Sequence, residues 1–412
     1  MGRKGVVLVP SYMRTFSCIG SACEDTCCAG WRVELDIETY KKYTTIRDPE
    51  LKRIVDKKVT RNRSNPTNQA YAKIKPVGDN LCPFLNEEKL CSMQLKKGEE
   101  YLSTVCSAYP RITNIVNSVI ERSATVSCPE VARLALLNPD GIEFDEVEEE
   151  IGGKINLIKV MNFSESAKTK LEDYFWELRI FSIQVLQNRN YSVADRLVIL
   201  GFFYQRLAEI AKEGQIGSIE QTIANFMAII QDESLHDTIK EIPSNTAIQM
   251  ELLKELADER YFAGFSSQRY YNCFSAFLSG IEYTLTEKIE DIAVRYQDAY
   301  VNFYLPFMKD HEYILENYLV NYVFKNTFPL SGSKDLFEEY VRMVVHFALI
   351  KMNLIGMARY YKEEFSIDHV ILLIQSFSKT VEHNQFFLNH AYKLLAQNGY
   401  TTMAYMAVLI KN

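Results

Sequence analysis

Histidine and long apolar runs are missing from the N-terminal part of this 412-residue chain, and the chain as a whole has no excess of positive charge. No histidine precedes His236, so a metal site built from the first half must use thiolates or carboxylates. The apolar run at residues 6–9 ends at Pro10, short of the about 7–15 residues of a secretory signal. No later stretch approaches the about 20 apolar residues of a membrane span. We therefore expect a cytoplasmic protein without a membrane segment.

The charge balance excludes further classes of partner. The chain has 46 Lys and Arg against 53 Asp and Glu, which gives a net charge of −7. Nucleic acids and anionic membranes attract proteins with excess Lys and Arg, so we expect neither as a partner. The composition, 47% hydrophobic and 24% charged, is that of a globular protein and excludes disordered and fibrous classes.

The first 150 residues are rich in turn signals. Eight of the eleven prolines lie at or before Pro139, which predicts short, irregular segments, with one helical exception near residues 36–54. Residues 143–150 carry six carboxylates and precede Gly152-Gly153, a pattern typical of a solvated connector. We expect one domain at 1–150 and a second at 151–412.

The second domain has helical periodicity. Leu171, Phe175, Leu178, Phe181 and Val185 recur every three or four residues, as expected for an apolar stripe on a helix. Further helical windows are predicted at 197–210, 219–230, 248–261, 270–287, 291–303, 312–324, 336–361, 367–383 and 386–397. The expected fold class is mainly α: an irregular cysteine-rich metal-binding N-terminal module followed by an α-helical domain.

What the N-terminal module does have is cysteine. Eight of the nine cysteines fall within the first 128 residues, and they are Cys18, Cys23, Cys27, Cys28, Cys82, Cys91, Cys106 and Cys128. A chain of this length buries a large enough core to fold without disulfides or metals. Disulfides are rare in the cytoplasm, where clustered thiols usually hold metal. We therefore predict an all-thiolate metal centre built from these eight residues.

The spacing leaves the metal open. The first four cysteines form a C-x4-C-x3-C-C pattern, and Cys82 and Cys128 each stand directly before proline. Sulfur-only ligation is typical of structural zinc and of iron–sulfur clusters alike. Adjacent Cys27 and Cys28 seldom both bind one small ion, so one of them is a candidate for a second site. Reduced cysteines without a metal are the third alternative.

Several separated motifs resemble the flagellin lysine-N-methylase family, often called FliB, and the wider cysteine-cluster family with a zinc- or iron-chelating N-terminal domain. The motifs, in order, are SCIGSACEDTCCAGW at 17–31, RNRSNP at 61–66, YAKIK at 71–75, CPFL at 82–85, CSAYPR at 106–111 and SCPE at 127–130. The helical part resembles that family mainly in length and architecture.

The resemblance implies an enzyme that methylates surface lysine ε-amines of flagellin, with S-adenosylmethionine as donor and a [4Fe–4S] cluster in the N-terminal module. It favours iron–sulfur over zinc. The sequence alone has no G-x-G-x-G after a strand, so it predicts no Rossmann-like donor site. Cys23 and Cys27 match the first gap of the radical S-adenosylmethionine motif, but Cys28 follows immediately.

Methyl transfer to lysine requires a neutral amine, although a free lysine has a pKa of about 10.4. An enzyme must therefore desolvate the amine or place a base beside it. Tyr109, close to Cys106, is the catalytic candidate; the alternative is a turn residue that positions Cys106. Arg32 and Arg111 are candidates for binding the donor carboxylate, or for neutralising anionic thiolates.

Residues 51–75 contain eight Lys or Arg and one acid, Asp56. The simplest interpretation is a solvated helix and loop; the more specific one is a surface that docks an acidic protein substrate. The competing function is a non-enzymatic zinc- or iron-binding adaptor whose helical domain holds a partner. The sequence gives no indication of oligomeric state.

Overall fold

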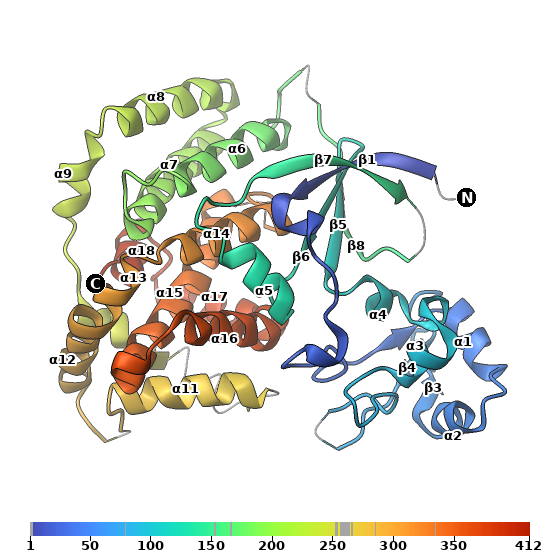
Figure 1. Cartoon of the computed structure of the whole chain (residues 1–412). Coiled ribbons are helices and arrows are strands. Elements are labelled where there is room, and N and C mark those ends of the chain that lie inside the picture. The colour runs from blue at the N-terminus through green and yellow to red at the C-terminus, as the bar shows by residue number, and fades with distance from the viewer. Residues whose placement is uncertain are drawn as a thin grey trace. The chain divides into compact units, whose positions relative to one another are not determined.

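The computed structural model describes residues 3–78, 80–151, 154–164, 167–251, 254–255, 264, 267–284, 286–333 and 335–412. The chain divides into two compact units. Unit 1 comprises Met1–Val131 and Phe144–Met161, and unit 2 comprises Ala132–Glu143 and Asn162–Asn412. Figure 1 shows strands and short helices in unit 1 and mostly helices in unit 2. The mainly α class predicted from the sequence is confirmed.

Unit 1 contains a five-stranded sheet that the sequence did not predict. Its order is β7-β1-β6-β5-β8. The strands are β1 (Arg3–Pro10), β5 (Arg111–Val116), β6 (Val119–Ala124), β7 (Phe144–Ile151) and β8 (Leu157–Met161). β1 is parallel to β6 and antiparallel to β7, whereas β5 is antiparallel to β6 and parallel to β8. The expectation of an irregular module is therefore wrong for this part of the unit.

The acidic run is a strand rather than a connector. Every residue of β7 pairs with a residue of β1, from Phe144↔Pro10 to Ile151↔Arg3. Successive side chains of a strand point to opposite faces, so the carboxylates are divided between the two faces instead of being crowded together. Glu149 forms an ion pair with Arg122 of β6, and Asp145 lies 3.4 Å from Arg14. Backbone pairing with β1 thus holds residues 144–150 in a strand, although their charge pattern predicts a solvated connector.

A second, small sheet and two helices form the cysteine-bearing part of unit 1. The sheet has the order β2-β4-β3, with β2 (Glu34–Leu35), β4 (Ala72–Ile74) and β3 (Val59–Arg61). The predicted helical stretch at 36–54 is two helices, α1 (Ile37–Thr44) and α2 (Pro49–Lys58). Asp36 and Asp48 cap them by accepting backbone N–H bonds, which satisfies donors that a helix start leaves unpaired. The shorter helices are α3 (Ser92–Lys97), α4 (Thr104–Ala108) and α5 (Pro129–Leu136).

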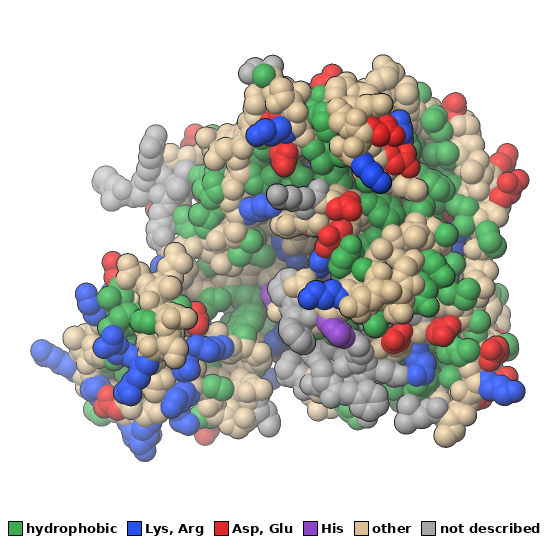
Figure 2. Space-filling model, turned by 180° about the vertical axis from the view of Figure 1, so that it is seen from behind, with side chains coloured by type: hydrophobic (Ala, Val, Ile, Leu, Met, Phe, Trp, Pro, Cys, Tyr) green, Lys and Arg blue, Asp and Glu red, His purple; other side chains and the backbone are tan. Residues whose placement is uncertain are grey.

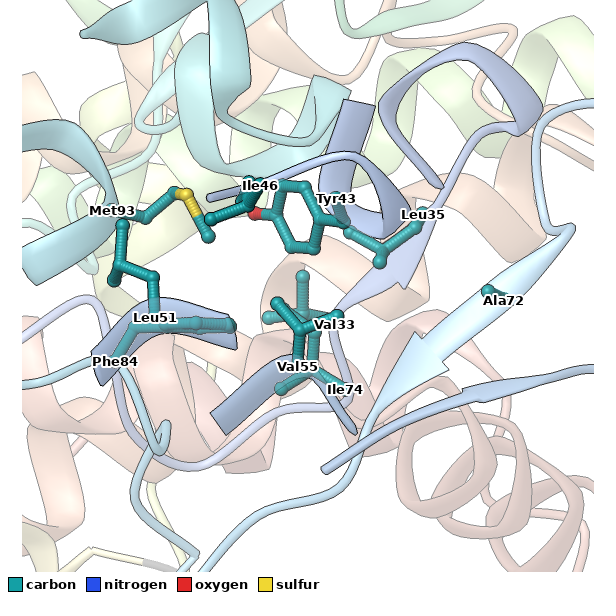
Figure 3. Packing of buried hydrophobic residues seen from close by; sticks show 10 residues of the cluster. All are labelled: Val33, Leu35, Tyr43, Ile46, Leu51, Val55, Ala72, Ile74, Phe84 and Met93. Atoms are coloured by element: carbon teal, nitrogen blue, oxygen red, sulfur yellow. The ribbon is translucent and has the colours of Figure 1, made fainter. Parts of the chain in front are cut away.

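These elements enclose one apolar cluster (Figure 3). Tyr43 of α1 lies between Met93 and Leu35 in this view, and its ring meets that of Phe84 edge to face at 5.8 Å. The other members come from the small sheet, α2 and adjoining loops, and they are Val33, Ile46, Leu51, Val55, Ala72 and Ile74. Cys82 and Cys91 pack against this cluster from its edge. The packed core therefore fixes the backbone that carries these two cysteines.

Unit 2 is helical, as predicted. Its helices are α6 (Phe175–Leu186), α7 (Val193–Glu213), α8 (Ile219–Gln231), α9 (Leu235–Lys240), α11 (Gln268–Gly280), α12 (Ile289–Ala299), α13 (Leu305–Met308), α14 (Tyr313–Lys325), α15 (Leu336–Tyr361), α16 (Ile367–Phe377), α17 (Gln385–Gln397) and α18 (Met403–Ile410). Two π-helical segments occur, at Tyr300–Tyr304 and Ser378–Glu382. Most of the predicted window at 248–261 lies outside the described residues.

Helix α15 is the central element of unit 2. It is long and apolar enough to cross a membrane, but 94% of its most apolar window is buried inside the protein, as in the core helix of a globular domain. It packs tightly on α11 where Gly280 faces Gly356. A Cβ added to Gly280 would lie 1.9 Å from the Gly356 carbonyl oxygen, so only glycine permits this approach.

Candidate functional site: a cysteine-bearing loop cluster

Backbone hydrogen bonds hold the first two cysteine motifs together. The amide of Cys82 donates to the carbonyl of Cys28 at 2.7 Å, and the amide of Gly30 donates to Asn80 at 3.1 Å. Ala29 and Leu81 form an isolated antiparallel bridge between these bonds. The second half of the first motif and the Cys-Pro motif thus form one short ladder. Sequence spacing alone cannot reveal such a pairing.

Cys91 joins the same cluster through a tight turn. Leu85 and Cys91 form a second isolated bridge, and the amide of Ser92 donates to Phe84 at 2.7 Å. Cys91 is the N-cap residue of α3. Because Phe84 is buried in the apolar cluster, the turn is anchored and its thiol is held beside Cys82.

The four thiols of this ladder interact directly. Cys28 forms side-chain hydrogen bonds with Cys27, Cys82 and Cys91. These bonds raise the pKa of Cys28. At the other end of each bond, the interaction with Cys28 lowers the pKa of Cys82 and lowers the pKa of Cys91 to about 6. The proton therefore stays on Cys28, and Cys91 is largely a thiolate at neutral pH, the form that ligates metals.

Three of the other four predicted cysteines lie in a different neighbourhood. Cys128 has Cys23 and Cys18 as neighbouring thiols, and burial raises the pKa of its own thiol to about 11. Cys106 neighbours the first group, namely Cys82 and Cys91. Four of the eight thiols thus form a cluster centred on Cys28, with Cys106 nearby. The other three, Cys18, Cys23 and Cys128, form a looser set. None of the nine cysteines forms a disulfide in the part of the chain that the structure describes.

The thiols do not form a preformed metal site. Within the residues that the structure describes, no group of three or more Cys, His, Asp or Glu side chains is arranged so that it could hold an ion. The donor chemistry still fits a sulfur-ligated centre, because Cys28 contacts three other thiols and the pKa values of two of them, Cys82 and Cys91, are lowered. The metal centre predicted from the sequence stays a prediction.

Tyr109 lies between the two cysteine neighbourhoods. Its neighbours include the thiols of Cys128 and Cys27, and its hydroxyl lies 3.2 Å from the Ser127 hydroxyl. Desolvation raises the pKa of Tyr109 well above its usual value of 10.0, so the phenol is neutral at pH 7. The ring of Trp31 meets the Tyr109 ring edge to face at 4.7 Å. Tyr109 can therefore donate or accept a hydrogen bond beside an aromatic wall.

Trp31 also lines a cleft. Its volume is about 390 Å³, and it is lined by Gly30, Trp31, Arg32, Lys73, Ile74, Lys75, Pro76 and Asn80. The Arg32 guanidinium donates to Asn62 at 3.3 Å and lies 3.3 Å from Glu34, which fixes it at the rim. The cleft therefore combines one indole face with three cationic side chains next to the Cys28 cluster.

The predicted arginines do not form a pair. Arg32 lines the cleft, whereas the Arg111 guanidinium packs over the ring of Phe16 at 5.1 Å from β5. The sequence interpretation missed Trp31, Lys73 and Lys75 as cleft residues. Lys73 and Lys75 alternate with buried Ile74 in the YAKIK motif, and this period of two is the signal of a strand that presents its lysines on the surface.

Unit 2 contains a buried lysine, Lys351, whose pKa lies far below its usual value. The Lys351 ammonium donates to the Ile410 carbonyl at 2.8 Å and lies 5.2 Å from the Tyr300 ring centroid. Desolvation lowers the pKa of Lys351 to about 7, although Glu312 and Asp195 raise it. This lysine ties α15 to α18, and it belongs to the core of unit 2.

Unit 2 also contains a buried ion pair with two arginines. Glu316 of α14 accepts from Arg196 at 2.7 Å and from Arg189 at 3.0 Å through each of two nitrogens. The Glu316 and Arg196 side chains are almost fully buried. A charge network of this kind fixes the packing of α7 against α14.

Comparison with known proteins gives a consistent result. Residues 179–409 match the model of the FliB lysine N-methylase C-terminal domain. The chain is 25% identical over 390 residues to the lysine-N-methylases of Salmonella typhimurium (strain LT2) and Salmonella choleraesuis (strain SC-B67), covering 92% of each chain. It is 34% identical over 140 residues to the flagellar biosynthetic protein FliU of Salmonella muenchen, covering 34% of this chain and 82% of FliU. No solved structure matches.

Proposed function

Because the chain belongs to the FliB lysine N-methylase family, we propose that it is a protein lysine N-methyltransferase acting on flagellin. The observation that carries the proposal is the family match, which covers residues 179–409. Two relatives named lysine-N-methylase align over 92% of the chain, so the match extends into the cysteine-bearing unit. The similarity to a protein named flagellar biosynthetic protein supports a flagellar substrate.

We propose S-adenosylmethionine as the methyl donor. The lysine nitrogen forms a bond to the methyl carbon while the carbon–sulfur bond breaks, so a neutral thioether leaves and the methylated amine then loses a proton. The lone pair is available only on the neutral amine, and a free lysine with a pKa of about 10.4 is almost fully protonated at pH 7. The site must therefore lower the pKa of the acceptor.

The cleft beside Trp31 has the chemistry to do this. Desolvation against an aromatic wall disfavours an ammonium, and nearby positive charges disfavour it further. Trp31 supplies the wall, and Lys73 and Lys75 supply the charges. Tyr109, whose ring meets that of Trp31 edge to face, is the candidate to accept a hydrogen bond from the reacting amine or to relay its proton through Ser127.

Arg32 is the candidate for the donor carboxylate. Its guanidinium is held by Asn62 and Glu34 at the cleft rim, and a guanidinium can bind a carboxylate through two parallel hydrogen bonds. Arg111 packs over Phe16, so its proposed role is electrostatic: its positive charge stabilises anionic thiolates.

We propose that Cys27, Cys28, Cys82 and Cys91 hold a [4Fe–4S] cluster, with zinc as the alternative. Bound iron–sulfur would supply a redox-active centre, whereas bound zinc would supply a structural tie. Clustered thiols that hold metal are typical of a reducing compartment, so we propose that the reaction takes place in the cytoplasm.

The test is methylation by anaerobically purified protein. We expect incubation with flagellin and S-adenosylmethionine to add steps of about 14 Da to substrate lysines, as mass spectrometry detects. Flagellin whose lysines are blocked by acetylation serves as the control and should gain no mass. An unmodified flagellin, after incubation with protein whose metal content is intact, would contradict the proposal and favour a non-enzymatic adaptor.

A further inference from the structure

The small sheet and α2 present a strongly basic surface on a chain that is acidic overall. Residues 51–75 hold eight Lys or Arg and one acid, while the whole chain has a net charge of −7. Figure 2 shows Lys and Arg side chains gathered over this part of unit 1. We define the basic surface by Arg53, Lys57, Lys58, Arg61, Arg63, Lys73 and Lys75.

Within the part of the chain that the structure describes, carboxylates leave the basic surface unpaired. Lys52, in the same segment, pairs with Asp56. None of the seven residues of the basic surface forms an ion pair with a carboxylate among the residues that the structure describes. Lys57, Arg61, Arg63 and Lys75 are exposed to solvent. An uncompensated cluster of this size attracts an acidic partner.

The backbone beneath the surface is rigid. Lys75 donates its amide to the Lys58 carbonyl at 2.7 Å, which joins the end of α2 to β4. The guanidinium of Arg61 lies 4.6 Å from the centre of the Tyr71 ring. The surface also continues into the cleft, because Lys73 and Lys75 line it. A partner on the basic surface therefore reaches directly to the mouth of the cleft.

We infer that the basic surface docks acidic residues that flank the target lysine, so that the enzyme selects lysines in acidic surroundings on its protein substrate. This inference rests on the proposed function. A cleft with three cations lowers the pKa of an acceptor lysine but also repels it. Flanking carboxylates on the basic surface offset that repulsion, and they bind without entering the cleft. Because the proposed substrate is a protein, the occupant of the basic surface is an acidic polypeptide rather than a nucleic acid.

The first experiment changes two exposed residues of the surface that lie outside the cleft, Lys57 and Arg63. The variant Lys57→Glu/Arg63→Glu should raise the KM for flagellin at least tenfold and leave kcat unchanged. The matched control is Lys240→Glu/Lys309→Glu, which alters the net charge equally at two exposed residues of unit 2 and should keep the KM. An unchanged KM in the first variant, or an equal rise in the control, overturns the inference.

The second experiment changes the substrate. Synthetic peptides carry one lysine flanked by glutamates, by glutamines or by arginines. The protein should prefer the glutamate peptide at least tenfold in kcat/KM, and Lys57→Glu/Arg63→Glu should reverse the preference towards the arginine peptide. Such a charge swap separates direct docking from a folding defect. Equal use of the glutamate and glutamine peptides overturns the inference.

A binding measurement keeps the inference separate from the proposed function. Fluorescein-labelled glutamate peptide should bind the protein without any methyl donor, and anisotropy should show weaker binding as salt screens the charges. If no lysine is methylated but this binding persists and is lost in Lys57→Glu/Arg63→Glu, the proposed function fails and the docking surface stands. Tighter binding of a single-stranded RNA 20-mer than of the peptide, lost in the same variant, overturns the inference.

Discussion

The amide of Cys82 donates a 2.7 Å hydrogen bond to the carbonyl oxygen of Cys28. This single bond places two cysteine motifs from distant parts of the sequence on one short ladder, and it brings the Cys28 thiol into contact with Cys82 and Cys91. The cluster is therefore enforced by backbone pairing, before any metal is considered. It separates these thiols from Cys128, whose neighbours are Cys23 and Cys18.

Replacing Cys28 tests whether this cluster is a metal centre. We expect Cys28→Ser to lose most of its bound iron, measured with sulfide and zinc after anaerobic purification, because Cys28 contacts all three other thiols. The control Cys273→Ser removes a buried thiol in unit 2 and should keep the metal. Full metal content in Cys28→Ser would refute the cluster.

The same measurement on Cys18→Ser distinguishes one centre from two. Cys18 is an exposed thiol of the looser set. If the Cys28 cluster is the centre, Cys18→Ser should retain its metal content. A loss equal to that of Cys28→Ser would mean that both neighbourhoods contribute to one site.

Tyr109→Phe tests the role of the phenol. The change removes the hydroxyl beside Ser127 but keeps the ring that contacts Trp31. We expect kcat for lysine methylation to fall about 10²-fold, within the range of a lost acid–base group, with little change in KM. Ser127→Ala should retain most activity if Tyr109 acts directly on the amine. Equal kcat for Tyr109→Phe and unchanged protein would leave Tyr109 as a turn residue only.

Because of the buried Lys351, we expect the stability of the protein to depend on pH. Desolvation lowers its pKa to about 7 in the folded protein, from an ordinary value of 10.5. Between about pH 7 and 10 the unfolded chain therefore binds a proton that the folded chain does not, so the free energy of unfolding rises with pH by about 1.4 kcal/mol per unit.

The variant Lys351→Met isolates this contribution. In urea denaturation at several pH values, the free energy of unfolding of Lys351→Met relative to that of the unchanged protein should be greatest near pH 7. The difference should shrink towards pH 10. Parallel stability curves for the two proteins would show that Lys351 keeps its ordinary pKa in the fold.

Glu316→Gln tests the buried ion pair of unit 2. The change leaves the buried guanidinium of Arg196 without its carboxylate, 2.7 Å away, and should lower the free energy of unfolding by about 3–5 kcal/mol. The comparison is Asp56→Asn, which breaks the exposed pair with Lys52 and should cost less than about 1 kcal/mol. Similar losses in both variants would mean that burial adds nothing to the Glu316 pair.

The helices of unit 2 could be predicted because their apolar stripes are local. The stripe from Leu171 to Val185 corresponds to α6 and the 3-10 turn before it, and the apolar window at 336–361 is α15. Gly280 and Gly356 were not singled out, since their importance depends on two helices meeting at one point.

The sheet of unit 1 could not be predicted in the same way. The acidic run at 143–150 has the charge pattern of a solvated connector, yet it pairs with β1 at the opposite end of the unit's sequence. Such pairing uses backbone groups, so side-chain patterns carry little trace of it. For the candidate site, the sequence predicts the cysteines and Tyr109, and this stays a prediction. The contact of Trp31 with Tyr109 is visible only in the folded chain.

The central claim is that this chain transfers a methyl group to lysine and needs the Cys28 cluster to do so. The most direct measurement uses donor with a trideuterated methyl group and intact-mass analysis of flagellin, comparing the unchanged protein with Cys28→Ser and Cys273→Ser. The account predicts steps of about 17 Da on lysines for the unchanged protein and Cys273→Ser, and none for Cys28→Ser. No labelled lysine in any sample, or equal labelling in all three, would contradict it.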